Sequence, residues 1–184
     1  MPALKEWSAA IHALLDGRQT VLLRKGGIGE KRFVLQANEF LLFPTVAHSH
    51  AERVRAECRD LLTAAECDSS DARIVIRAAA KVIAAVDVKR PERLPDIEDL
   101  HIWTAASVRE DRLDFRPRHL LTALIVQVSP LIEPIRRDRG PWCAGCTSWV
   151  NVPMTPPFAI ELGDPVRDTD FLAEVARRVA LTVG

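Results

Sequence analysis

The segment LLRKGGIGEKRF, residues 22–33, places Arg24 and Lys25 directly before Gly26 and Gly27. Glycine lets a ligand approach the backbone closely and leaves N–H groups exposed, and arginine binds phosphate through paired hydrogen bonds. Residues 16–32 hold five cations and two carboxylates, a local charge of +3. The segment therefore predicts a binding site for an anion such as phosphate.

The alternative for the same segment is a glycine-containing turn between two strands with solvated charges. No Gly-Lys-Ser/Thr sequence ends it, so it is not a Walker A loop. It also lacks the last glycine of a dinucleotide-binding fingerprint and is expected to lead into a strand, not a helix.

Histidines supply the candidate acid/base groups. His48 lies in FPTVAHSHAE, directly before a predicted helix that Ser49 would cap, and His101 begins the segment HIWT. A histidine beside a helix N-terminus has a lowered pKa and can act as an acid/base group or hydrogen-bond donor. The alternative for His48 is a structural role at the helix entry. Because the rings of His48 and His50 would diverge around a helix start, we predict no metal there.

Two further candidate binding groups are indoles, Trp103 in HIWT and Trp149 in GCTSW, the latter beside Cys146. A tryptophan in a loop can stack on a nucleic-acid base, and it can equally close the end of a barrel. Cys143 and Cys146 have the spacing of half a zinc site, but the remaining cysteines, Cys58 and Cys67, fall within one predicted helical region. We therefore predict no metal and no cofactor.

The elements that must position these residues follow from hydrophobic periodicity. The spacing of apolar residues predicts a helix over residues 3–16, a second helix over about 50–66, a short helix capped by Thr104 and a last helix over 169–182 with Asp168 or Thr169 as its N-cap. Strands are predicted for RQTVLLR, RFVLQ, EFLLFP, TSWVNV and FAIEL.

Two longer strands are predicted in the middle of the chain. Residues 73–88 alternate between apolar and polar or small side chains, and a strand of this length usually bends or carries a bulge. The segment HLLTALIVQVSPLI reads as a buried central strand. Strands joined by short turns with few helices predict an α+β fold: a small bent or barrel-like, PUA-like mixed β-sheet flanked by helices.

Composition limits the function classes. With 184 residues we expect a single domain over 1–184, and 25 basic and 25 acidic residues give no net charge. That balance argues against binding nucleic acid by bulk charge, but it permits a local patch. No apolar run approaches the ~20 residues of a membrane span and no export signal is visible, so we expect no membrane partner and a cytoplasmic location.

The blocks KEW, LLRKGGIGE, FLLFPTVAH, HIWT and GCTSW occur in this order. The series resembles the uncharacterised bacterial family catalogued as domain of unknown function 1802, from Lys5 to about Val152, with a C-terminal helix over 168–184 outside the blocks. The resemblance implies no established activity. It implies a link to restriction–modification and defence, because some members sit beside a restriction-endonuclease-like domain.

Three functions remain open from the sequence. The first is a nucleic-acid or nucleotide-binding module that holds a phosphate at Arg24 and Lys25. The second is an enzyme acting on a small phosphorylated or nucleotide substrate, with His48 or His101 as acid/base and Arg24 binding the anion. The third is an interaction subunit, without activity of its own, for a protein partner in a restriction-type system.

Overall fold

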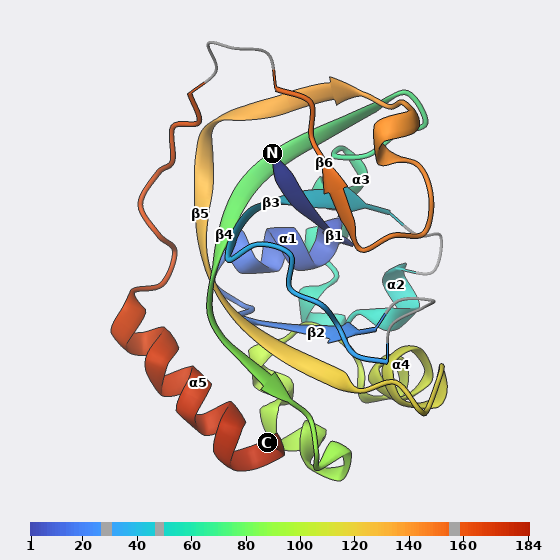
Figure 1. Ribbon diagram of the computed structural model, residues 1–184, viewed down its shortest axis with the longest axis vertical. Coiled ribbons are helices and arrows are strands. Elements are labelled where there is room, and N and C mark those ends of the chain that lie inside the picture. The colour runs from blue at the N-terminus through green and yellow to red at the C-terminus, as the bar shows by residue number, and fades with distance from the viewer. Residues whose placement is uncertain (27–30, 47–49, 155–158) are drawn as a thin grey trace.

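The computed structural model describes residues 1–26, 31–46, 50–154 and 159–184, and its sheet curls into a half-barrel (Figure 1). Six strands follow the order β2-β5-β4-β3-β1-β6. Their bounds are Pro2–Trp7 (β1), Val21–Lys25 (β2), Glu39–Thr45 (β3), Arg73–Asp87 (β4), Leu121–Asp138 (β5) and Trp149–Asn151 (β6). β1 and β3 are parallel and the other four neighbouring pairs are antiparallel, so the sheet is mixed, and the predicted α+β class with a bent sheet is confirmed.

The two longest strands, β4 and β5, form the curved backbone of the sheet (Figure 1). They pair from Arg73↔Asp138 to Asp87↔Thr122, with register shifts between Ile76 and Ala78 and between Val82 and Ala84. A bulge bends its strand and increases the local twist. These irregularities therefore account for part of the curl, and the predicted bulged strand over residues 73–88 is confirmed.

The N-terminal helix prediction over residues 3–16 was wrong in its first half. Residues Pro2–Trp7 form β1, and only Ser8–Leu15 form a helix, α1. β1 lies between β3 and β6, and its residues Ala3 and Leu4 are fully buried. Pairing on both edges stabilises the extended backbone more than a first helical turn would, although the apolar spacing of this segment also fits a helix.

The helix predicted over 50–66 is interrupted in the structure. It divides into α2 (His50–Arg53), the 3₁₀ turn η1 (Ala56–Cys58) and α3 (Leu61–Glu66). The break lies at Val54, which is fully buried and forms an isolated antiparallel bridge with Trp103.

Two of the predicted short strands are absent from the described residues. RFVLQ is irregular with Phe33 buried, and in FAIEL only Leu162 forms an isolated bridge, to Leu131.

The remaining helical elements cover the ends and one side of the sheet. They are η2 (Pro91–Leu100), α4 (Ala105–Val108), the π-helical turn η3 (Arg109–Asp114), the 3₁₀ turn η4 (Pro141–Cys143) and α5 (Thr169–Val183). The cap predicted for α4 is confirmed, since the side chain of Thr104 accepts a backbone N–H, and of the two candidates for α5, Asp168 rather than Thr169 is the cap. Within the described part of the chain, no helix is both long and apolar enough to cross a membrane.

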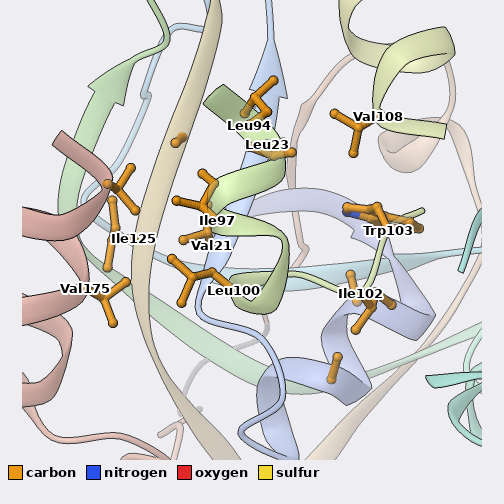
Figure 2. Close-up of a cluster of buried hydrophobic side chains, with 14 of the residues drawn as sticks. Val21, Leu23, Leu94, Ile97, Leu100, Ile102, Trp103, Val108, Ile125 and Val175 are labelled. Atoms are coloured by element: carbon orange, nitrogen blue, oxygen red, sulfur yellow. The ribbon is translucent and has the colours of Figure 1, made fainter. Parts of the chain in front are cut away.

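The largest buried cluster joins helices to the sheet (Figure 2). Ile97 and Leu100 of η2 lie beside Val21 of β2, while Ile125 of β5 faces Val175 of α5 (Figure 2). The segment η2 is therefore anchored on β2, the strand that carries Arg24 and Lys25, and α5 is anchored on the neighbouring strand β5.

Candidate functional site

Arg24 occupies the end of β2 and forms an ion pair inside the half-barrel. Its Nη1 lies 2.9 Å from Oε2 of Glu6 and donates a second hydrogen bond, 3.0 Å long, to the carbonyl oxygen of Lys5. The Glu6 side chain is 3% exposed and that of Arg24 is 12% exposed. Three strands separate β2 from β1 in the sheet, so this pair connects the two sides of the curled sheet.

Lys25 follows Arg24 and binds the end of a helical segment. Its Nζ donates hydrogen bonds to the carbonyl oxygens of Arg112, Leu113 and Phe115, the first of them 2.7 Å long. Carbonyl groups at a helical C-terminus lack partners within the helix, and a lysine commonly satisfies them. Burial lowers the pKa of Lys25 and the charge of Arg112 lowers it further, while the nearby carboxylate of Asp114 opposes the shift.

The glycine corner is described only in part. Gly26 is buried and its carbonyl oxygen lies 3.4 Å from Nδ1 of His119. The predicted site residues Gly27 and His48 lie outside the described residues.

Two further arginines lie in the same region. Arg112 donates from Nε to the carbonyl oxygen of Leu23, at 3.1 Å, and Arg53 forms an ion pair with Asp111. Burial lowers the pKa of Arg112, with Glu6 opposing that shift and Arg24 adding to it, so these charges interact. We call six residues the cationic cluster: Glu6, Arg24, Lys25, Arg53, Asp111 and Arg112. Its described members are four cations and two carboxylates, a net charge of +2.

Indole rings border this cluster. The ring of Trp7 meets that of Trp103 edge to face, with centroids 5.1 Å apart, and the guanidinium of Arg53 lies 5.9 Å from the centroid of Trp7. A cleft of about 10 Å³, which has room for about one water molecule, is lined by Trp7, Trp103, Asp111 and Arg112. The structure therefore brings an indole and a guanidinium to one hollow.

Trp149 and Cys146 lie elsewhere. Trp149 donates from Nε1 to the carbonyl oxygen of Val34 and stacks on Phe33, whose ring also lies under Arg24. Trp149 therefore approaches Arg24 only through Phe33, and it packs on a different core cluster from Trp103. Cys146 is exposed, while the Cys143 thiol is buried and donates to the carbonyl oxygen of Gly140.

His101 faces another hollow. Its ring is buried, and Nδ1 accepts the backbone N–H of Trp103 at 3.3 Å. Burial, aided by the charge of Arg55, lowers its pKa to about 4, so the ring is neutral at pH 7. It lines a cavity of about 360 Å³ between η2 and α4–η3, and Val108 borders both this cavity and the indole cleft.

Sequence reasoning identified Arg24 and Lys25 but missed the other four of the six residues of the cationic cluster. Glu6 and Trp7 occur in the block KEW, but both fall within the helix predicted over residues 3–16 and neither is predicted as a site residue. Arg53, Asp111 and Arg112 carry no local signal, because nothing in the sequence around them specifies that α2 and η3 reach the end of β2.

The family model described as Domain of unknown function (DUF1802) matches residues 3–178, nearly the whole chain. The chain belongs to the DUF1802 family. The resemblance based on the five blocks is thereby confirmed. In this DUF1802 chain, Glu6, Trp7, Arg24, Lys25 and Trp103 all come from those blocks and lie in or beside the cationic cluster. No curated protein sequence matches the chain.

Proposed function

We propose that this protein is a nucleic-acid or nucleotide-binding module that holds a phosphate group at the cationic cluster. The observation that carries the proposal is the net charge of +2 among six partly or fully buried residues in a chain whose total charge is zero. Charges removed from water are costly when they lack counterions. A bound anion would lower that cost.

The arginines would have different roles in binding. Arg53 retains 27% exposure of its side chain, and Arg112 lines the cleft beside Trp7 and Trp103. These two would contact the phosphate, since guanidinium groups form paired hydrogen bonds with its oxygens. All four cations already have protein partners, Asp111 for Arg53 and the Leu23 carbonyl for Arg112 among them. Arg24 and Lys25 do not line the cleft, so they would contribute charge and position.

The indole rings that border the cleft supply a second contact, because the cleft itself, at about 10 Å³, is too small to hold a base. A base or sugar next to a phosphate at Arg112 would meet Trp7, which is half-buried, more readily than Trp103, which is 6% exposed. Stacking on an aromatic ring tolerates any base, so the proposal specifies no nucleotide sequence. A role beside a restriction-type enzyme, implied by the family resemblance, belongs to the same proposal.

The experiment is a titration of intrinsic tryptophan fluorescence with short single-stranded DNA, single-stranded RNA and duplex DNA. We expect binding at about 50 mM salt that weakens strongly by about 200 mM, because bound cations displace condensed counterions. Arg53→Gln and Arg112→Gln should each weaken binding and reduce the salt slope by about 1.

Arg136→Gln is the matched control. Arg136 is exposed on the far half of β5, whose other end pairs with β2. Its loss should leave the binding unchanged. Absence of salt-dependent binding to all three nucleic acids would reject the proposal, as would equal losses for Arg136→Gln and for a folded Arg53→Gln variant.

A further inference from the structure

The cavity next to His101 has the dimensions of a small-molecule site. Its volume is about 360 Å³, and ligand pockets commonly span about 300–1,000 Å³. The 3₁₀ segment η2 forms one wall, and α4 with η3 forms the other. Much of the lining is apolar, including Leu94, Pro95, Ala105, Val108 and Leu113; Figure 2 shows Leu94 and Val108 on their two elements.

One buried polar group lines this apolar cavity. His101 is 2% exposed, and its Nδ1 accepts the N–H of Trp103. The neutral ring therefore carries its proton on Nε2. In the described structure Nε2–H has no protein partner. Nε2 is not among the side-chain atoms that are both fully shielded and without a partner, so it is open to the cavity, and a ligand with a hydrogen-bond acceptor at this position would replace water there.

The charges around the cavity are mainly negative. The lining contains Glu92, Glu98, Asp114 and Arg109. Nε of Arg109 lies 3.6 Å from Oδ2 of Asp114, which leaves two carboxylates, Glu92 and Glu98, without an ion-pair partner among the described residues. This lining would repel a phosphate, so the cavity differs in ligand class from the cationic cluster.

We propose that this cavity binds a small organic cation: an amine with an apolar body that carries an oxygen acceptor. The apolar body would pack between Leu94 and Val108, and its acceptor would receive the Nε2–H of His101. The ammonium group would lie at the rim near Glu92 and Glu98, where both carboxylates are exposed and the cation stays partly hydrated. This ligand is separate from the proposed phosphate group, and its binding does not depend on the nucleic-acid proposal.

The test uses four related probes and isothermal titration calorimetry with the full chain. The reference probe, 4-methoxyphenethylamine, carries the ammonium group, the aromatic ring and an ether oxygen as acceptor. In 4-ethylphenethylamine the acceptor is missing, and in N-acetyl-4-methoxyphenethylamine the positive charge is missing. The fourth probe, 3-(4-methoxyphenyl)propanoate, carries a negative charge in place of the positive one. We expect the first probe to bind most tightly and the carboxylate most weakly. Equal affinities of the amine and its neutral N-acetyl derivative would overturn the proposal, as would no binding of any probe.

Variants locate the binding site. The double variant Glu92→Gln, Glu98→Gln should lower the affinity for 4-methoxyphenethylamine roughly two- to tenfold, because each exposed ion pair contributes little to binding. Glu66→Gln removes an exposed carboxylate from α3, outside the cavity lining, and should change nothing. Ala105→Trp places a large side chain in the cavity from an exposed position, so it should abolish binding without disturbing the core. Unchanged binding to a folded Ala105→Trp variant would overturn the assignment to this cavity.

His101→Gln tests the donor. If the variant is folded, the preference for the methoxy over the ethyl probe should disappear. A preference that persists would show that the acceptor does not meet His101. If the variant does not fold, the Ala105→Trp result and the ranking of the four probes decide the proposal.

Discussion

Glu6 and Arg24 form an ion pair across the half-barrel, with Oε2 and Nη1 2.9 Å apart and Glu6 3% exposed. Glu6 also accepts the backbone N–H of Trp7 through Oε1, at 2.8 Å. The pair joins β2 at one edge of the sheet to β1, which lies beyond β5, β4 and β3. The curl of the sheet and the position of the cationic cluster therefore depend on the same contact.

Breaking this ion pair should destabilise the fold. Glu6→Gln should lower the free energy of unfolding by about 3–5 kcal/mol, because it leaves Arg24 with an unpaired charge in the interior. Arg24→Met should lower the free energy of unfolding by a similar amount, because it leaves the Glu6 carboxylate unpaired in the interior. In the double variant we expect less than the sum of the two losses, measured by urea unfolding as a double-mutant cycle.

The ion pair of Lys81 and Glu39 provides the control double-mutant cycle. Their ion pair, 3.7 Å long, also joins two strands, but the side chains are 59% and 72% exposed. Its coupling should be below about 1 kcal/mol. A Glu6–Arg24 coupling no larger than this would show that the pair does not stabilise the curl.

Protonation of His101 should destabilise the protein in mildly acidic solution. Its folded pKa is about 4, against about 6.5 for an unfolded chain, so the unfolded state binds more protons between these values. Stability contributed by the neutral ring is present above about pH 6.5 and is lost as the pH falls toward 4, by about 3 kcal/mol in total. An NMR titration of the ring protons should give the folded pKa directly. A midpoint near 6.5 would contradict the burial of this ring.

Asp68 should stabilise the junction of α1 with β4. Its carboxylate is 1% exposed and accepts hydrogen bonds from Ser8 and from Nε of Arg77, with Nε2 of His12 2.7 Å away. Burial opposes ionisation, but His12 and Arg77 outweigh it, and the pKa of Asp68 is lowered. Asp68→Asn should cost about 1.5–3 kcal/mol at pH 7, because Arg77 loses its carboxylate partner while 34% of its side chain remains in contact with water.

The ionised Asp68 carboxylate also contributes stability that is lost on acidification, in a lower pH range than that of His101. The stability that the ionised Asp68 contributes is fully present above its unfolded-state pKa of about 3.9, and it is lost as the pH falls through its lower folded-state pKa. Urea midpoints between about pH 7 and pH 3 should therefore fall less steeply for Asp68→Asn than for the native chain. Asp71→Asn, at an exposed site three residues away, should follow the native curve.

The cap of the C-terminal helix gives a smaller effect. Oδ1 of Asp168 accepts the N–H of Phe171 at 2.8 Å. Asp168→Ala should lower stability by about 1 kcal/mol and increase fraying at the start of α5, as measured by amide hydrogen exchange. Asp170→Ala removes a carboxylate from the same helical turn without removing the cap and should cost less. Equal losses would show that charge alone is responsible.

Local sequence patterns correctly predicted those elements whose conformation is decided by residues close together in the sequence. The alternation over residues 73–88 identified β4, and Thr104 and Asp168 identified two helix starts, because strand periodicity and capping depend on neighbouring residues. The prediction failed for residues 3–7, where pairing with β3 and β6 decides the conformation. It failed also at Val54, whose bridge to Trp103 interrupts a helix.

The candidate site shows the same division. The sequence by itself determined that Arg24, Lys25, His101 and Trp103 are present, that the protein resembles its family and that the fold is α+β. Only the tertiary structure decided that Glu6 neutralises Arg24, that Lys25 caps η3 and that His101 lines a separate cavity. The physical reason is that these contacts join residues 18 to 90 positions apart, and their geometry depends on the curl of the whole sheet.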